Sequence, residues 1–299
     1  MGSEPLELAI EPGTPPRTIA RDIERAGVRV DARQLFAWFR LSGKVREIRA
    51  GNYEIPPGTT PIALLDKLVR GEESLRSLTL VEGWTFRQMR AALAREELRH
   101  DTASLSDAEI MQQLGRPGVP AEGRFFPDTY AYAKGSSDLA VLRRALHAMD
   151  RHLEAAWAQR SADTPLKSAD EALVLASIVE KETGQAADRP QIAGVFANRL
   201  RTGMLLQTDP TVIYGLGEKF DGNLRKRDLQ TDTPWNTYTR AGLPPTPIAM
   251  PGKASLMAAV QPQATRALYF VARGDGSSHF SATLEEHNRA VQRYQLQKK

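Results

Sequence analysis

Cysteine is absent from the 299-residue sequence, which excludes disulfides, thiolate metal sites and cysteine nucleophiles. Long hydrophobic runs are also absent. The longest apolar stretch, ALVLASIV, contains a serine and is far shorter than the roughly 20 residues that span a bilayer. No block of one charge sign stands out, because 40 lysines and arginines are interspersed with 36 aspartates and glutamates. We therefore expect a soluble chain with mixed solvated faces and no basic arm.

The residues that are present indicate a globular protein of one large domain or two unequal ones, and we expect two. Hydrophobic residues make up 41% of the chain, enough for a sizeable core. The formal net charge of +4 is compatible with an anionic partner such as nucleic acid, a membrane surface or a cell-wall polymer. The start Met1-Gly2-Ser3 is typical of an expression scar, so we expect that an N-terminal signal or anchor has been removed.

A weak pattern occurs three times near the N-terminus: an apolar stretch, a glycine followed by a threonine, and a helical periodicity. The copies are IEPGTPPRTIARDI, EIPPGTTPIALLDKL and LVEGWTFRQMRAAL. Each predicts a strand, a turn and a helix, although this is also how many short strand-to-helix loops are built. The expected turn residues are Gly13, Gly58 and Gly83, and the expected helix caps are Thr14, Thr59 and Thr85.

The coarse pattern predicts an α+β fold with a small α/β subdomain over residues 4–77 and a larger, mostly helical domain over 78–299. In the second part, helices are expected at LSDAEIMQQL, DLAVLRRALHAMDRHLEAAWAQR, KASLMAAVQ and LEEHNRAVQRYQ. Strands are expected at LYFVAR and HFSAT, and EGRFFPDTYAY is expected to be an aromatic loop.

The most informative segment is SADEALVLASIVEKETG, residues 168–184. Ser168 and Glu171 have the spacing of a capping box, and Gly184 is a stop signal, so a helix is predicted from about 169 to 183. Its apolar residues cover every side of the helix, which predicts a central, buried position.

Two glutamates, Glu180 and Glu182, fall in the last turn of this helix. Apolar surroundings and the negative end of the helix dipole both favour the neutral acid, so a carboxyl group there should have a raised pKa. A general acid needs such a pKa near neutral pH. Alternatively, the helix end is solvated and Lys181 pairs with one of the two. The spacing alone does not choose between them.

The order of several longer blocks resembles that of the YceG-like endolytic murein transglycosylases. These blocks are EGWTFRQM, EGRFFPDTY, LASIVEKETG, FANRLRTGMLLQTDPTVIYG, NTYTRAGLPPTPIAMPG and LYFVARGDGSSHFSATLEEHN. The resemblance implies that Glu180, the first glutamate of VEKE, is catalytic and that the N-terminal region is LysM-like. It also implies an inner-membrane protein with a single N-terminal anchor, absent from this chain, and a catalytic domain facing the periplasm. The implied partners are peptidoglycan glycan strands and peptidoglycan synthases.

The mechanism that the resemblance implies needs one carboxyl group, whereas ordinary glycoside hydrolases need two. Glu180 would protonate the bond between N-acetylmuramic acid and N-acetylglucosamine. It would then take the proton of the muramyl C6 hydroxyl, which attacks C1 of its own ring and forms a 1,6-anhydro sugar. The attacking hydroxyl belongs to the same sugar ring, so the attack is intramolecular and takes the place of attack by a bound water molecule. No metal or organic cofactor enters this scheme.

Candidate sugar contacts lie in the blocks that follow the helix: Gln207, Thr208, Asp209, Asn236 and Tyr238. Two aromatic residues of an earlier block, Phe126 and Tyr130, could form one wall of the site. Each has a structural alternative: Asp209 could be a turn or helix cap before a proline, and Tyr238 a buried ring with a satisfied hydroxyl. A second carboxylate near Glu180, for which Asp209 is the candidate, would permit hydrolysis.

The sequence also allows functions other than transglycosylation. His279 and His287 lack the spacing of a zinc site, so a structural role is expected for both. A peptidoglycan-binding module without activity and a muramidase with two carboxylates are the main alternatives. Nucleic-acid binding would require a basic face with aromatic residues, which the sequence does not show.

Overall fold

The computed structural model describes residues 6–296. The suspected expression scar at residues 1–3 lies outside this part of the chain. Within residues 6–296, none of the helices combines the length and the apolar character that crossing a membrane requires. The mixture of helices and short two-stranded sheets confirms the predicted α+β class.

The chain divides into two compact units. The first unit runs to Leu78 and also includes two later segments, Glu96–His100 and Ala131–Asp138. The second unit includes the segments between these and the chain from Leu139 onward. The sequence does not predict the two later segments of the first unit.

The first unit is built on an antiparallel pair of strands whose helices cover a separate apolar core. Strand β1 (Leu6–Ile10) pairs with β2 (Gly51–Ile55), with Leu8 opposite Tyr53. The helices are α1 (Pro16–Arg25), α2 (Ala32–Leu41), a short 3₁₀ turn (Lys44–Glu47) and α3 (Pro61–Arg70). Buried residues from the strands and all three α-helices form one cluster, which stabilises this unit.

All three sequence repeats form a strand, a turn and a helix, as predicted. Each turn glycine has a positive φ, between 76° and 83°, which side-chain-bearing residues rarely adopt. The predicted caps are wrong in two of the three copies. The Thr14 hydroxyl donates to the Glu11 carbonyl and does not cap α1. In the second copy Thr60, not Thr59, accepts the amide of Ala63.

In the third copy the predicted cap is confirmed. Strand β3 (Leu75–Thr79) leads through the turn to α4 (Phe86–Leu93), and Thr85 forms a capping box with Gln88. The expected aromatic loop is partly wrong, because its end forms strand β4 (Thr129–Ala133), which pairs with β3. The predicted helix between them is α5 (Asp107–Gln113).

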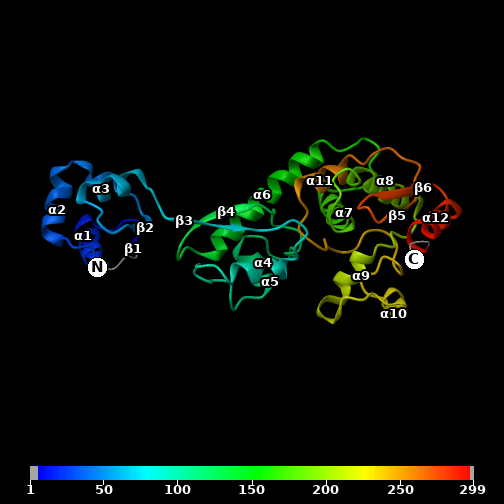
Figure 1. The fold of residues 1–299 in the computed structure, drawn as a ribbon, viewed down its shortest axis with the longest axis horizontal. Helices are drawn as coiled ribbons and strands as arrows, with labels where there is room; N and C mark the ends of the chain where they lie inside the picture. The colour runs from blue at the N-terminus through cyan, green and yellow to red at the C-terminus, as the bar shows by residue number, and fades with distance from the viewer. Residues whose placement is uncertain (1–5, 297–299) are drawn as a thin grey trace. The chain divides into compact units, whose positions relative to one another are not determined.

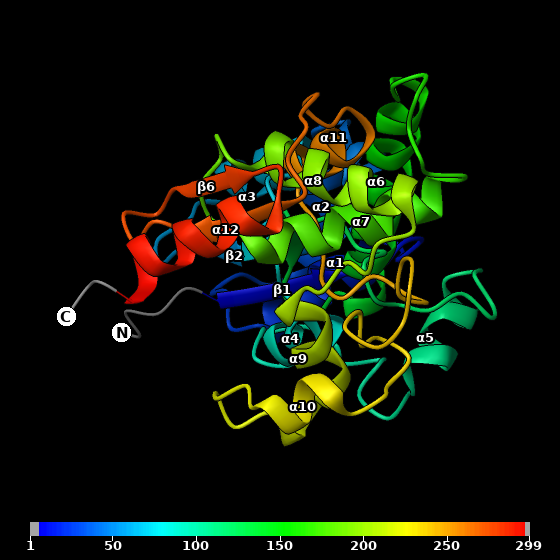
Figure 2. The same ribbon diagram turned by 90° about the vertical axis from the view of Figure 1, so that its right-hand side faces the viewer.

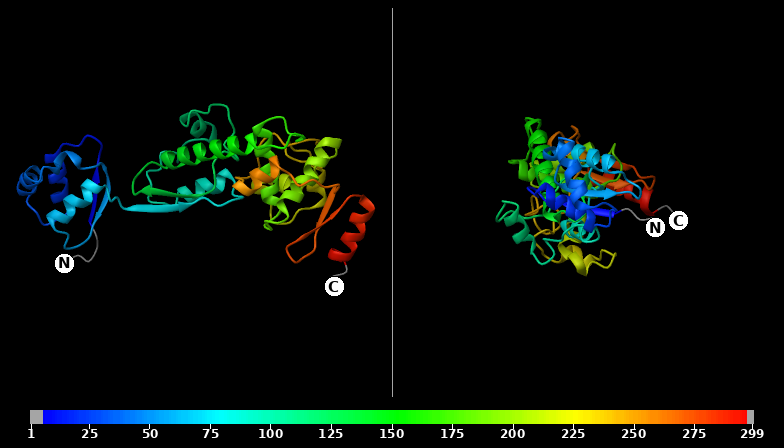
Figure 3. Two further views of the ribbon diagram at one scale, coloured as in Figure 1. Left: turned by 90° about the horizontal axis from the view of Figure 1, so that it is seen from above. Right: turned by 90° about the vertical axis from the view of Figure 1, so that its left-hand side faces the viewer.

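The second unit is mostly helical. The predicted long helix is α6 (Asp138–Ala158), which runs without interruption (Figure 3). Three helices, α7 (Ala169–Glu182), α8 (Arg189–Thr202) and α11 (Lys253–Val260), pack against one another in pairs (Figure 1). Their contact buries the largest apolar cluster around α7, so the end of α7 has a fixed position among its neighbours.

The remaining elements surround this core. Helices α9 (Asp209–Leu216) and α10 (Lys226–Gln230) lie between α8 and α11, where no helix was predicted from the sequence. The predicted C-terminal hairpin is β5 (Tyr269–Ala272) with β6 (Ser278–Ser281), and α12 (Leu284–Val291) packs on both strands (Figure 2). The 3₁₀ turn Gly217–Lys219 follows α9, and a π-helical turn, Gln292–Leu296, follows α12.

Candidate active site

The last turn of α7 carries three charged side chains, Glu180, Lys181 and Glu182. The helix is capped as predicted, because the Ser168 hydroxyl accepts the Glu171 amide at 3.2 Å. Residues 172–179 are all buried, on every side of the helix. The helix therefore reaches its charged end from inside the core.

Glu180 is enclosed by the two helices that pack on α7. Its side chain is only 6% exposed, so the alternative of a solvated carboxylate at this position is wrong. One carboxylate oxygen accepts the Gly252 amide at 2.9 Å, and the other lies 3.4 Å from a guanidinium nitrogen of Arg189. Arg189 begins α8 and Gly252 is the N-cap of α11. These two contacts fix the direction of the carboxyl group.

A second carboxyl group, that of Glu82, lies beside this pair. A Cβ atom on Gly252 would come within 1.8 Å of Glu82 Oε1, so a larger residue at this position would force the Glu82 side chain to move. Burial raises the pKa of Glu82, and the nearby charge of Glu180 raises it further. Glu82 was not among the residues singled out from the sequence, although it begins the EGWTFRQM block.

The three side chains of this turn have different surroundings. Lys181 donates to the Gly83 carbonyl at 3.3 Å and lines a large cavity. Glu182 lines a separate, smaller cavity of about 350 Å³. Glu180 contacts α8 and α11, as described above. The three charged side chains of this one helix turn therefore lie in three different environments.

Glu182 is half-buried, and its carboxylate accepts a hydrogen bond from the Thr208 hydroxyl. Burial raises the pKa of Glu182 to about 7, and the charge of Asp209 adds to the increase. The raised pKa expected for a carboxyl group in this turn is therefore found at Glu182.

Three of the predicted sugar contacts, Gln207, Asp209 and Tyr238, line the smaller cavity together with Glu182. The Tyr238 hydroxyl donates to Asp209 at 2.6 Å. Gln207 has a φ of 47°, a strained value for a residue with a side chain. The structure thus brings these residues together around Glu182, and their role in binding sugar stays a prediction.

Asn236 is buried and hydrogen-bonded to the backbone of residues near it in the sequence. Its side chain is fully buried, and the amide nitrogen donates to the carbonyls of Leu229 at 3.0 Å and Thr231 at 2.7 Å. Its carboxamide oxygen accepts the Tyr238 amide at 2.8 Å. Asn236 therefore holds the loop that carries Tyr238.

The two aromatic residues predicted as a wall of the site are both buried. Phe126 belongs to the core cluster around α7 and stacks on His152, with ring centroids 3.9 Å apart. The Tyr130 hydroxyl donates to the Phe126 carbonyl at 2.8 Å. These contacts are of the structural kind, and a contact with substrate stays a prediction for both.

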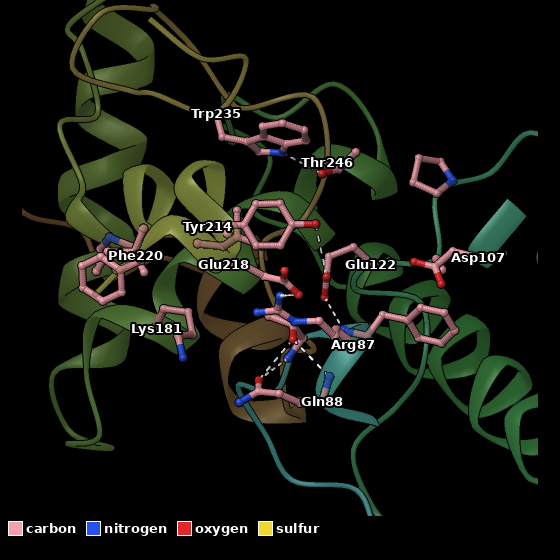
Figure 4. Close-up of a pocket in the computed structure, with 18 of the residues that line it drawn as sticks. Arg87, Gln88, Asp107, Glu122, Lys181, Tyr214, Glu218, Phe220, Trp235 and Thr246 are labelled. Carbon is pink, nitrogen blue, oxygen red and sulfur yellow. Dashed lines mark hydrogen bonds and ion pairs between the residues drawn. The ribbon is translucent and has the colours of Figure 1, made fainter. Parts of the chain in front are cut away.

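A cavity of about 1180 Å³ is lined by none of the residues predicted as catalytic or sugar-binding. Its aromatic lining residues are Phe86, Tyr214, Phe220 and Trp235, and Figure 4 labels the last three. Tyr214 and Trp235 meet edge to face, with centroids 5.4 Å apart. The Trp235 indole donates to the Thr246 hydroxyl at 2.9 Å.

Glu122 lies in the wall of this cavity and joins two elements. Its carboxylate accepts the amide of Phe86, in α4, at 3.1 Å and the hydroxyl of Tyr214, in α9, at 3.2 Å (Figure 4). Burial raises the pKa of Glu122 to about 7. Like Glu82, Glu122 begins an EG block of the sequence, and that shared dipeptide is the signal that could have identified both.

The two C-terminal histidines contact aromatic rings. His287 stacks on Tyr269 with centroids 5.3 Å apart, and His279 lies 5.5 Å from the Tyr294 ring. Burial lowers the pKa of His287, and the neighbouring Arg199 charge lowers it further. Ring contacts of this kind fit the structural role expected for both.

Comparison with known proteins decides the family. The model of the YceG-like family matches residues 8–293. The chain belongs to the YceG-like family. The resemblance seen in the sequence blocks is thereby confirmed.

This YceG-like chain is similar to proteins named endolytic murein transglycosylase. It is 32% identical to that of Bacillus subtilis strain 168, over 97% of this chain and 84% of the relative. It is 26% identical to that of Streptococcus pneumoniae strain D39, over 96% of this chain and 58% of the relative. A crystal structure of a YceG-like protein from Listeria monocytogenes matches with a TM-score of 0.60 and 29% identity, covering 96% of this chain and 99% of that one.

Proposed function

We propose that this protein is an endolytic peptidoglycan lytic transglycosylase in which Glu180 is the catalytic acid and base. The observation that carries the proposal is the enclosed carboxyl group of Glu180, 6% exposed and held by the Gly252 amide and Arg189, in a member of the YceG-like family. Relatives named endolytic murein transglycosylase support the substrate and the internal position of the cut.

In the proposed reaction, Glu180 donates its proton to the oxygen between N-acetylmuramic acid and N-acetylglucosamine, and the bond from C1 to that oxygen breaks. The C6 hydroxyl of the muramyl ring then attacks C1 and gives its proton back to Glu180. The products are a 1,6-anhydromuramyl end and a free hydroxyl on the departing sugar. Arg189 and the Gly252 amide orient the carboxyl group for both transfers.

A second candidate function, hydrolysis by a muramidase, is favoured by one observation. Glu82 brings a second carboxyl group next to Gly252, whose amide donates to Glu180, and the charge of Glu180 raises the pKa of Glu82. Such a group could activate a water molecule in the place of the C6 hydroxyl. The sequence pointed to Asp209 for this role, but Asp209 lies in the cavity of Glu182.

Digestion of purified, uncross-linked glycan strands with mass spectrometry of the products tests these proposals. We expect Glu180→Gln to lower the rate by about 10²- to 10⁴-fold, because the amide keeps the shape of the carboxyl group but has no proton to donate. Anhydromuramyl ends identify transglycosylation, and reducing muramic acid ends identify hydrolysis. Glu182→Gln is the matched variant from the same helix turn. An inactive Glu182→Gln beside an active Glu180→Gln would show that the assignment is wrong.

Further expectations from the family resemblance are proposals as well. We propose that the protein acts on the cell wall outside the cytoplasm, attached to the inner membrane through an N-terminal anchor. Its first unit would contact glycan as a LysM-like module, and peptidoglycan synthases would be its protein partners. The strand and helix pairs of that unit are the observation that supports the LysM-like assignment.

A further inference from the structure

The cavity of about 1180 Å³ is larger than the roughly 300–1,000 Å³ of a typical small-molecule pocket. It is lined by α4, α5, α9 and the loop that contains Trp235. This volume suits an extended oligomer better than a single small ligand. All lining residues belong to the second unit, which also contains Glu180.

Two chain segments connect Glu180 to this cavity. On α7, the next residue after Glu180 is Lys181, whose side chain lines the cavity. In the turn before α4, Gly83 lies so close that a Cβ atom on it would be 3.9 Å from Glu180 Cγ. Two residues further along, Thr85 also lines the cavity. The wall of the cavity thus begins next to the proposed catalytic carboxyl group.

The chemistry of the lining matches a sugar polymer. Pyranose rings have apolar faces of C–H groups, which pack on aromatic rings such as Tyr214 and Trp235. Their rims of hydroxyl and acetamido groups need hydrogen-bond partners, and the lining includes Gln88, Lys181 and Glu122. Apolar walls with a few polar groups are the general features of a ligand site.

We propose that this cavity binds the saccharide units of the glycan strand adjacent to the bond cleaved at Glu180. The inference rests on the proposed function and assigns it a binding subsite. Arg87 and Glu218, which both line the cavity, form an ion pair of 2.8 Å (Figure 4). Because both side chains are exposed, this pair contributes little and does not prevent entry of a strand.

The test uses a substitution that places a bulky side chain in the cavity from a residue outside the core. Ala108, on α5, is exposed and lines the cavity, so Ala108→Trp adds bulk there without removing a core contact. Gln112→Trp is the matched control, because Gln112 is exposed on the same helix and is not part of the lining. Trp235→Ala removes an aromatic wall, but Trp235 also packs against the core, so this variant serves as the second test.

The probe is an uncross-linked hexasaccharide of alternating N-acetylglucosamine and N-acetylmuramic acid. We expect Ala108→Trp to raise KM about tenfold or more with kcat little changed, as for a lost binding contact. In the Glu180→Gln background, the same substitution should weaken binding of the probe about tenfold. Gln112→Trp should match the parent in both measurements, and thermal unfolding confirms that each variant is folded.

Unchanged KM and unchanged binding in folded Ala108→Trp and Trp235→Ala would overturn the subsite proposal, while cleavage by the parent would leave the proposed function in place. A fall in kcat alone would also overturn it, because a pure binding subsite acts on KM. A parent that neither binds nor cleaves the probe would overturn the proposed function and the subsite with it.

Discussion

Glu180 and Glu182 are two residues apart, yet their surroundings differ. The carboxylate of Glu180 has a cationic partner and a backbone amide, whereas Glu182 accepts a hydrogen bond from the neutral hydroxyl of Thr208. A buried carboxyl group with a neutral partner is favoured in its protonated form. The two glutamates are therefore expected to respond differently to loss of charge.

Glu182 should make the stability of the protein depend on pH. Burial raises its pKa from the ordinary 4.5 to about 7 on folding, so its contribution to stability is fully present below about pH 4.5 and is lost as the pH rises through about 7. Relative to wild type, Glu182→Gln should gain about 1 to 3 kcal/mol in unfolding free energy between these limits. Urea unfolding of both proteins at several pH values measures this difference. A constant difference across this range would contradict the raised pKa.

The sequence could predict the position of these glutamates but not the directions of their side chains. The buried pattern of residues 172–179 was sufficient to place α7 in the core. The partners of Glu180, Arg189 and Gly252, come from distant segments whose approach depends on the packing of α8 and α11. For the same reason Glu82, which adjoins Glu180 through the tertiary fold, was missed.

At the scale of the elements, local signals predicted well wherever a helix is determined by its own residues. The Ser168 cap and the Thr85 capping box are both present. The box predicted for α7 is incomplete, because Glu171 accepts the amide of Lys167 instead of that of Ser168. Helices α2, α8, α9 and α10 were not predicted, and in α9 a proline and a glycine resemble loop signals.

Adjacent threonines before α3 allow a direct test of helix capping. Thr60→Ala should lower the unfolding free energy by about 1 kcal/mol, because the Ala63 amide loses the hydroxyl that it contacts at 3.3 Å. Thr59→Ala should have a smaller effect, since that hydroxyl donates to the Pro56 carbonyl before the helix. Chemical denaturation of the two variants compares them. A larger loss in Thr59→Ala would show that the cap is assigned to the wrong residue.

At the scale of the whole molecule, two apolar clusters belong to the two units. One cluster contains only residues of the first unit, including Phe39, and the other surrounds α7 in the second unit, including Phe196. Composition and length left one large domain or two unequal ones open, and two were expected. The return of residues 96–100 and 131–138 to the first unit depends on tertiary pairing, which local patterns do not contain.

We expect two unfolding transitions, one for each cluster. Phe39→Ala should lower the stability of one transition by about 3 to 5 kcal/mol, because it leaves a cavity at a fully buried position. Phe196→Ala should lower the other transition by a similar amount. Calorimetry of each variant shows which of the two unfolding transitions is shifted. A single cooperative transition, shifted equally by both substitutions, would contradict independent cores.

The end of α7 also limits how the sequence can change by insertion. Successive helical residues are rotated by about 100°, so one extra residue before Glu180 would turn the following side chains toward the wrong neighbours. The Glu180 side chain would then point where Lys181 now points, and the Lys181 side chain would point where Glu182 now points. Volume-conserving substitutions elsewhere on this helix can be absorbed by repacking, but a change of length here would misdirect all three charges at once.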